Sequence, residues 1–240
     1  MGKYKLVVHT DPKSPVSEAY RTLRTNIQFL SLDNPIKTII VTSAGPGEGK
    51  TTTVINLAIA MAQSGSKVLL IDGDLRKPAL HRIFSIPNEP GLTYVLVSGL
   101  SYKEGISSTY IEGLEILPVG IIPPNPSELL ASDKMKQLLK EVGKDYDFVL
   151  MDSSPAAVVT DACILSTMVD GTILVCASGQ APIDGAKRAK ELLENVNANI
   201  IGVVLNKIPT NRKGYSQYYY YQYYEEPAPK QSKKRSRANG

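Results

Sequence analysis

The chain contains an apolar run, Thr38-Ile39-Ile40-Val41-Thr42-Ser43, that leads directly into the glycine-rich segment Ala44-Gly45-Pro46-Gly47-Glu48-Gly49-Lys50-Thr51. A buried strand, a glycine-rich loop and a helix in this order form a phosphate-binding P-loop. Glycines let consecutive backbone N–H groups surround phosphate oxygens, and the N-terminus of the following helix adds a partial positive charge. In such a loop Lys50 reaches the β- and γ-phosphates of a nucleotide, and the hydroxyl of Thr51 binds Mg²⁺. We expect nucleotide contacts from Gly45, Gly47, Glu48, Gly49, Lys50, Thr51 and Thr52.

The first position of the usual P-loop pattern is glycine, and here it is Ala44. The departure is mild because alanine is small and three glycines follow it. The alternative is a glycine-rich turn between a strand and a helix that ends in Lys-Thr by chance. The flanking apolar run and the amphipathic stretch after Thr51 favour the P-loop.

Short apolar runs alternate with amphipathic stretches over most of the chain. This pattern predicts β-α units around a buried parallel sheet, and right-handed crossovers place helices on both faces. The expected strands are residues 37–43, 67–72, 114–119, 148–152, 172–177 and 199–206. The expected helices are residues 14–32, 50–64, 126–142, 160–168 and 183–196. We therefore predict an α/β fold of the P-loop NTPase type, with a doubly wound, mainly parallel sheet.

The chain divides into three expected parts. Residues 1–34 form an N-terminal segment with an amphipathic helix, and residues 35–208 form the P-loop domain. Residues 209–240 are rich in tyrosine and basic residues and have almost no aliphatic side chains. Because such a segment cannot contribute to a hydrophobic core, we expect a flexible tail.

Composition narrows the class of protein. The chain has 240 residues and a mass of 26.1 kDa, and 42% of its residues are hydrophobic. These values suit one large folded domain and exclude disorder throughout the chain. The formal net charge is +4, but residues 230–240 hold five basic and no acidic side chains. The rest of the chain is therefore slightly acidic, which argues against a nucleic-acid-binding core.

The two cysteines, Cys163 and Cys176, lie in apolar surroundings and match no metal-binding spacing. We therefore expect a reduced, cytoplasmic chain without a disulfide framework. The longest apolar stretch, residues 156–177, is interrupted by Asp161 and Asp170, so no segment is expected to cross a membrane. Any association with a membrane would then require a partner protein.

Two further apolar runs lead into acidic residues. Residues 68–72 end in Asp72, with Asp74 two positions later, and residues 148–152 end in Asp152. Because the carboxyl ends of parallel strands meet at one edge of a sheet, these acids are expected beside the P-loop. There they can hold Mg²⁺ or orient an attacking hydroxyl group. The alternative is that each aspartate caps a helix that follows its strand.

Asn206 and Lys207 end the last expected strand and are expected near the base of the nucleotide. In GTPases an Asn-Lys pair of this kind is followed two positions later by an aspartate that reads guanine. Here that position is Pro209, so ATP is the expected nucleotide. The alternative is a plain turn.

Seven of the thirteen tyrosines lie close together near the C-terminus. They are Tyr215, Tyr218, Tyr219, Tyr220, Tyr221, Tyr223 and Tyr224. The run follows neither helical nor strand periodicity, so we interpret it as an array of hydroxyl groups that a phosphoryl donor can modify. Residues 209–218 can span roughly 30 Å, enough for the tail to reach its own site or that of a neighbour. Base stacking on RNA and an adhesive patch are the alternatives.

Together these motifs resemble those of the bacterial tyrosine kinases (BY-kinases), P-loop kinases that are unrelated to the eukaryotic protein kinases. The three nucleotide motifs of that family match residues 44–51 (Walker A), 69–76 (Walker A′, Asp-x-Asp-x-Arg) and 149–155 (Walker B). The tyrosine cluster matches as well. So does Glu18-x-x-Arg21-x-x-Arg24, which links subunits into a ring in the family.

The resemblance implies ATP-dependent phosphorylation of protein tyrosines, including the chain's own C-terminal cluster. Lys50 and Thr51 would bind the ATP phosphates and Mg²⁺, and Asp74 and Asp152 would help to hold the metal. Asp72 would accept or orient the proton of the tyrosine hydroxyl group. Lys50, Asp72, Asp74 and Asp152 are thus the implied catalytic residues.

The resemblance also implies partners. The chain is similar to the split form of the family, in which a separate transmembrane protein of capsule or exopolysaccharide assembly activates the kinase at the inner face of the cell membrane. A phosphotyrosine phosphatase, further protein substrates and other copies of the chain are the remaining implied partners, and no nucleic acid is expected. Glu18, Arg21 and Arg24 recur at a spacing of three and so share one helix face. A solvated ion pair is the alternative explanation of that face.

Two other functions remain open. A positioning ATPase of the MinD/ParA class would act as a switch without a protein substrate, but it carries an additional signature lysine at the position of Gly45. A scaffold that binds nucleotide only structurally would use the tail as its interaction surface.

Overall fold

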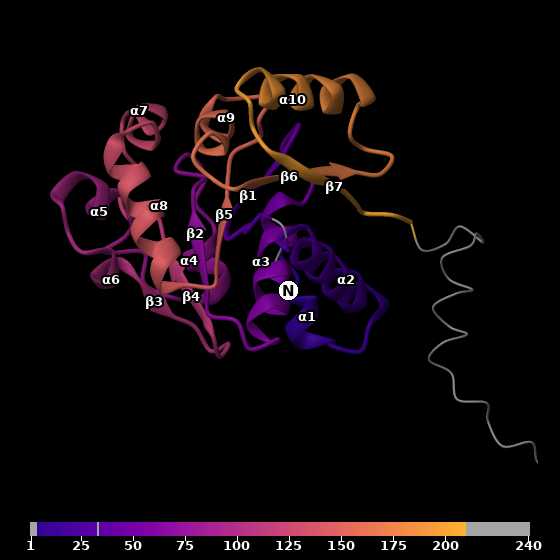
Figure 1. Ribbon diagram of the computed structural model, residues 1–240, viewed down its shortest axis with the longest axis horizontal. Helices are drawn as coiled ribbons and strands as arrows, with labels where there is room; N and C mark the ends of the chain where they lie inside the picture. Colours follow the sequence, from indigo (N-terminus) through magenta and orange to yellow (C-terminus); the bar gives the residue numbers. More distant parts are fainter. Residues whose placement is uncertain (1–3, 33, 210–240) are drawn as a thin grey trace, which may run out of the picture. The chain divides into compact units, whose positions relative to one another are not determined.

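The computed structural model describes residues 4–32 and 34–209 (Figure 1). Within these residues the chain forms a seven-stranded sheet in the order β3-β4-β2-β5-β1-β6-β7. The strands are β1 (Thr38–Ser43), β2 (Val68–Asp72), β3 (Ser107–Ser108), β4 (Leu114–Leu117), β5 (Phe148–Asp152), β6 (Gly171–Ala177) and β7 (Ile200–Asn206). Neighbouring strands are parallel except β3 and β4, which are antiparallel. This confirms the predicted α/β fold with a mainly parallel sheet.

Helices cover both faces of the sheet (Figure 1). They are α1 (Val7–Thr10), α2 (Pro15–Leu30), α3 (Lys50–Ala62), α4 (Leu80–Phe84), α5 (Leu92–Ser98), α6 (Tyr102–Gly105), α7 (Pro126–Leu130), α8 (Asp133–Asp145), α9 (Asp161–Ser166) and α10 (Ile183–Asn195). Helices α1 to α4 pack into one hydrophobic cluster, and α5 to α10 pack into the other. In β1, Ile39 and Val41 belong to the first cluster and Ile40 to the second. This alternation explains the uninterrupted apolar runs of the sequence, since both faces of each central strand are buried.

Helix α3, which begins directly after the P-loop, lies between the sheet and α2 and is buried along almost its whole length. Helix α2 begins with Pro15, and the hydroxyl of Ser14 accepts a hydrogen bond from the backbone N–H of Ser17 (3.2 Å), the usual cap of a helix N-terminus. Its buried side chains Tyr20 and Ile27 join the core around α3. The N-terminal helix is therefore attached to the body of the domain by apolar packing.

The structure corrects some predicted elements. The helix predicted over residues 126–142 is two helices, because Ser132 interrupts it and its hydroxyl caps the N-terminus of α8 by accepting from the N–H of Met135. The strand predicted over residues 114–119 ends at Leu117, since Pro118 has no N–H to donate. The short elements α1, α4, α5, α6 and β3 were not predicted.

None of the helices in the described part of the chain combines the length and the apolar character that a membrane crossing requires.

Candidate active site

The P-loop connects the end of β1 to α3, as the sequence predicts. Its backbone needs glycine at two points, because Gly47 and Gly49 have φ angles of +79° and +101°. A Cβ atom at Gly49 would also lie 2.0 Å from the side-chain nitrogen of Asn206. The loop conformation therefore depends on the glycines themselves and on a contact from β7.

Residues outside the loop hold its shape. The buried carboxylate of Glu48 accepts hydrogen bonds from the backbone N–H groups of Gly45 (2.5 Å) and Ala177 (3.4 Å). Asn206 donates to the carbonyl oxygen of Glu48 (2.9 Å), and Lys207 donates to that of Gly47 (2.6 Å). The side chains of Glu48 and Asn206, both predicted to contact nucleotide, thus contact the loop backbone.

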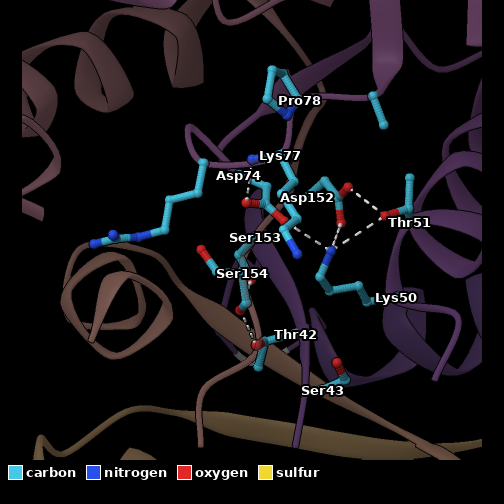
Figure 2. Close-up of polar contacts among 12 residues, drawn as sticks. Thr42, Ser43, Lys50, Thr51, Asp74, Lys77, Pro78, Asp152, Ser153 and Ser154 are labelled. Atoms are coloured by element: carbon cyan, nitrogen blue, oxygen red, sulfur yellow. Dashed lines mark hydrogen bonds and ion pairs between the residues drawn. The ribbon is translucent and has the colours of Figure 1, made fainter. Parts of the chain in front are cut away.

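Lys50 lies between two carboxylates at the start of α3 (Figure 2). Its Nζ atom is 3.2 Å from Asp74 Oδ2 and 3.7 Å from Asp152 Oδ1. Burial by itself would lower the pKa of Lys50, but the negative charges of Asp152 and Asp74 outweigh it and raise that pKa above its ordinary value. The lysine is thus charged and held at the mouth of the P-loop, where phosphate oxygens would bind.

Thr51 and Asp152 form the pair that fits a magnesium ion. The hydroxyl of Thr51 donates to Asp152 Oδ2 (2.7 Å) (Figure 2), and Asp152 Oδ1 is buried without a hydrogen-bond partner. Burial raises the pKa of Asp152, although Lys50 and Thr51 oppose that rise. A hard divalent cation prefers such oxygen atoms, and it would take its other ligands from phosphates and water. Accordingly, the described residues contain no cluster of three or more acidic, histidine or cysteine side chains that could hold a metal by themselves.

Asp72 is fully buried beside these residues and has a different set of contacts. Its Oδ2 atom accepts hydrogen bonds from the backbone N–H groups of Ala79 (2.9 Å) and Leu80 (3.0 Å), which closes the turn between β2 and α4. Burial, together with the nearby Asp152, raises the pKa of Asp72 to about 7. Asp74 lies within the same turn and points toward Lys50 (Figure 2).

A further buried carboxylate, Asp161, was not predicted from the sequence as a site residue. It accepts two hydrogen bonds from the guanidinium of Arg76 (2.8 and 3.1 Å) and one each from the hydroxyls of Ser127 (2.7 Å) and Ser154 (3.1 Å). Burial would raise the pKa of Asp161, but these donors hold it below its ordinary value. The sequence does contain a signal for Asp161. It is Arg76 of the Asp-x-Asp-x-Arg motif, because a guanidinium fixed beside the site needs an acidic partner.

The remaining predicted residues lie on α2, in the first turn of α3, or outside the described residues. On α2, Arg21 pairs with Glu18 (3.0 Å) and also donates to the carbonyl oxygen of Pro12 (2.6 Å). Arg24 donates to the carbonyl oxygen of Ala60 on α3 (3.1 Å). Thr52 follows Thr51 in the first turn of α3. The seven tyrosines from Tyr215 to Tyr224 lie outside the described residues.

Known proteins resemble this chain over most of its length. The family model described as an AAA domain matches residues 36–204. Tyrosine-protein kinase YwqD of Bacillus subtilis is 44% identical over 214 residues, which cover 89% of this chain and 90% of YwqD. The crystal structure of the chimerical protein CapA2B2 has a TM-score of 0.82 and 44% identity, over 85% of this chain and 90% of that one. The kinase domain of the Escherichia coli tyrosine kinase ETK has a TM-score of 0.83 and 32% identity, over 90% of this chain and 85% of that one.

A positioning ATPase is a more distant match. The cell division ATPase MinD of Pyrococcus furiosus is 27% identical with a TM-score of 0.60, over 70% of this chain and 71% of that one. The P-loop, its flanking carboxylates and these similarities together lead to one conclusion: the chain belongs to the bacterial tyrosine kinases, a family of enzymes with a P-loop NTPase fold.

Proposed function

We propose that this chain uses ATP and Mg²⁺ to phosphorylate tyrosines of proteins, including its own Tyr215 to Tyr224, and that it thereby regulates capsule or exopolysaccharide synthesis. The main support is the arrangement at the start of α3. There Lys50 lies between Asp74 and Asp152, and Thr51 donates to Asp152. A cation between phosphate-binding amides and two carboxylates suits phosphoryl transfer, which depends on positioning and charge compensation.

In this proposal the P-loop amides and Lys50 hold the phosphates, and Thr51, Asp74 and Asp152 hold Mg²⁺. The metal supplies positive charge that offsets the charge of the phosphates. Asp74 keeps the Lys50 ammonium in place through its 3.2 Å contact. These groups are already in place in the site and need little reorganisation when the phosphoryl group moves.

We assign the proton transfer to Asp72. A carboxylate with a pKa of about 7 is suited to take a proton near neutral pH. The phenolic oxygen bonds to the γ-phosphorus, its proton passes to Asp72, and the bond between that phosphorus and the bridging oxygen of ADP breaks. The turn before α4 engages Asp72 Oδ2, whereas Asp72 Oδ1 is buried without a hydrogen-bond partner among the described residues, so Oδ1 is the oxygen that would take the proton.

Incubation of the purified chain with labelled ATP, Mg²⁺ and the cytoplasmic segment of its activator tests this function. We expect label on tyrosine, and we expect Lys50→Met to abolish it. Lys190→Met is the matched control, because Lys190 is exposed on α10 and pairs with Glu194, away from the P-loop. ATP hydrolysis without phosphotyrosine, or label that survives Lys50→Met, would contradict the proposal.

A mixture of two variants tests whether the phosphoryl group is transferred within one copy of the chain or between copies. A Lys50→Met chain would supply tyrosines, and an active chain cut after residue 209 would supply the site. Label on the Lys50→Met chain shows transfer between copies. An unlabelled mixture of chains that are each folded would show transfer within one chain.

We also propose that the face of Glu18, Arg21 and Arg24 joins copies into a ring, and that a separate transmembrane activator recruits this ring to the inner face of the membrane. A phosphotyrosine phosphatase would reverse the modification. Light scattering after size-exclusion chromatography tests the ring. Arg21→Ala is expected to lower the assembled mass, whereas Arg188→Ala, an exposed arginine on α10, is expected to leave it unchanged. Equal masses for both variants would contradict the assigned face.

A further inference from the structure

A hollow lies at the end of the sheet where β1 begins, opposite to the end that carries the P-loop. It has a volume of about 470 Å³ and lies between α8 and the residues at the beginnings of β1 and β6, and we call it the α8 pocket. Lys37 and Thr38 line it at the start of β1, whereas the P-loop follows the end of the same strand. A six-residue strand spans about 20 Å, so the α8 pocket is separate from the nucleotide site.

The rim of the α8 pocket is cationic. Lys136, Lys140 and Lys144 recur every four residues and so form one stripe along α8, and Lys37 lies opposite them. All four are exposed. Among the described residues Lys136 pairs with Asp133, and no acidic side chain is within ion-pair distance of the other three lysines.

One acidic residue, Asp170, lines the same hollow. Its Oδ2 atom accepts hydrogen bonds from the N–H groups of Lys37 (3.0 Å) and Thr38 (2.8 Å) and from the Thr38 hydroxyl (2.8 Å). Asp170 therefore fixes the start of β1, and the four lysine charges exceed its single negative charge. An anionic group with more than one charge is the complementary ligand.

Part of the wall of the α8 pocket is apolar. Leu139 is buried at its wall, and Met168 lines it from the segment before β6. Gly143 lines the same hollow from the last turns of α8. Glycine destabilises a helix interior relative to alanine, and here a Cβ would approach only Thr38 Cγ2, at 4.0 Å. Packing thus does not require this glycine, but a larger side chain there would fill the hollow.

An aromatic ring that carries a phosphate is complementary to a hollow with an apolar part of its wall and a cationic rim. We propose that the α8 pocket binds a phosphotyrosine of the segment 215–224 of a second copy of this chain. The ring would lie against Leu139 and Met168 in the space that Gly143 leaves open, and the dianionic phosphate would face Lys37, Lys140 and Lys144. The inference rests on the proposed function, because its ligand is the product of that reaction.

A synthetic peptide with the sequence of residues 215–224 and one phosphotyrosine tests the pocket without any kinase reaction. We expect the phosphatase-treated full chain to bind it, measured by fluorescence anisotropy, at least about tenfold more tightly than the unphosphorylated peptide. Gly143→Leu and Lys140→Gln are each expected to weaken binding about tenfold or more. Lys134→Gln is the matched control, because Lys134 lies on α8 but donates to the carbonyl oxygen of Val97 and does not line the pocket.

Other outcomes would overturn the proposal. If inorganic phosphate competes as well as phenyl phosphate does, the site binds any phosphate and does not recognise the ring. If Lys140→Gln instead releases the chain from vesicles of phosphatidylcholine and phosphatidylglycerol, and the phosphopeptide does not bind, the surface is a membrane contact. Equal binding by the Gly143→Leu chain, shown to be folded by circular dichroism, would also contradict the proposal.

Mixing two full chains tests the source of the phosphotyrosine. The donor is a Gly143→Leu chain treated with ATP, and its phosphotyrosine content is measured first. The acceptor is an untreated Lys50→Met chain with an intact pocket. We expect donor and acceptor to form a complex in sedimentation experiments. The free phosphopeptide should compete for the pocket and dissociate this complex. A donor without phosphotyrosine would count against the proposed function, whereas a phosphorylated donor that binds no acceptor would count against a second copy as the source.

Discussion

Asp72 and Asp152 are paired neighbours at the ends of strands β2 and β5, yet each carboxylate holds a different part of the site. Asp152 accepts the hydroxyl of Thr51 at 2.7 Å, at the start of the helix that follows the P-loop. Asp72 accepts the N–H groups of Ala79 and Leu80 and so closes the turn that carries Asp74. Burial disfavours the charge on both carboxyls and raises both pKa values; the charge of Asp152 adds to this rise at Asp72, and the charge of Asp74 adds to it at Asp152.

The raised pKa of Asp72 predicts a pH-dependent stability. Its folded-state pKa is about 7 and its unfolded value is 3.8, so between these values the folded state binds more protons. The stabilisation is therefore complete below pH 4 and is lost as the pH rises through 7, by roughly 4 kcal/mol at most. Asp72→Asn keeps an oxygen acceptor for Ala79 and Leu80 and should flatten this slope. Urea unfolding of both chains between pH 5 and 8 measures the difference, and parallel curves would contradict the assigned pKa.

Asp72→Asn also tests whether Asp72 accepts the proton of the tyrosine or only holds the turn in place. If Asp72 takes the tyrosine proton, the variant loses phosphorylation while it keeps nucleotide affinity, and the pH dependence of the rate near neutrality disappears. A variant with the same pH–rate profile as the unaltered chain would show that Asp72 acts only through the turn.

Thr51→Val is expected to destabilise the chain by about 1–3 kcal/mol, because the buried Asp152 loses the hydroxyl that donates to its Oδ2 atom. We also expect Mg²⁺-dependent nucleotide affinity to fall about tenfold or more. Thr51→Ser retains the hydroxyl and serves as control. Calorimetric titration with nucleotide, with and without Mg²⁺, measures the effect. An unchanged Mg²⁺ dependence in the valine variant would remove Thr51 from the proposed metal site.

Gly49→Ala is expected to abolish nucleotide binding. The new methyl would lie 2.0 Å from Asn206 Nδ2, and alanine at a φ of +101° strains the backbone by about 1–3 kcal/mol. Gly143→Ala is the control, since that position is helical and a Cβ there meets no atom closer than 4.0 Å. Fluorescent nucleotide titration and thermal unfolding compare the two. Equal nucleotide affinity for both variants would mean that the loop adapts.

Arg76→Gln tests the buried carboxylate of Asp161. We expect the free energy of unfolding to fall by roughly 1–3 kcal/mol at neutral pH. The lower end of this range is expected, because the Arg76 side chain is 40% exposed and the hydroxyls of Ser127 and Ser154 still donate to Asp161. The pKa of Asp161 is below its ordinary value of 3.8, so its stabilisation is present at neutral pH and is lost as the pH falls through that lowered pKa. Urea unfolding at pH 7 and below pH 4 should show the difference between the two chains shrink with acidity. A constant difference would place the effect of Arg76 elsewhere.

The amino-acid sequence alone determined the parts of this protein that depend on local pattern. The apolar runs before the P-loop, Asp72 and Asp152 are short enough for strands and buried on both faces, so their order predicted a parallel sheet. The glycines of the P-loop could be recognised because a positive φ is a local property of the backbone. The convergence of Lys50, Thr51, Asp74 and Asp152 followed from the rule that parallel strands end at one edge.

Only the tertiary structure decided which partner each of these side chains has. Asp72 and Asp74 are two residues apart and looked alike, but one closes a turn and the other faces Lys50. Arg76 meets Asp161 across 85 residues of sequence, and the α8 pocket joins residues of α8, β1 and the segment before β6. Such contacts depend on how helices pack on the sheet, and packing brings together residues whose separation along the chain carries no periodic signal.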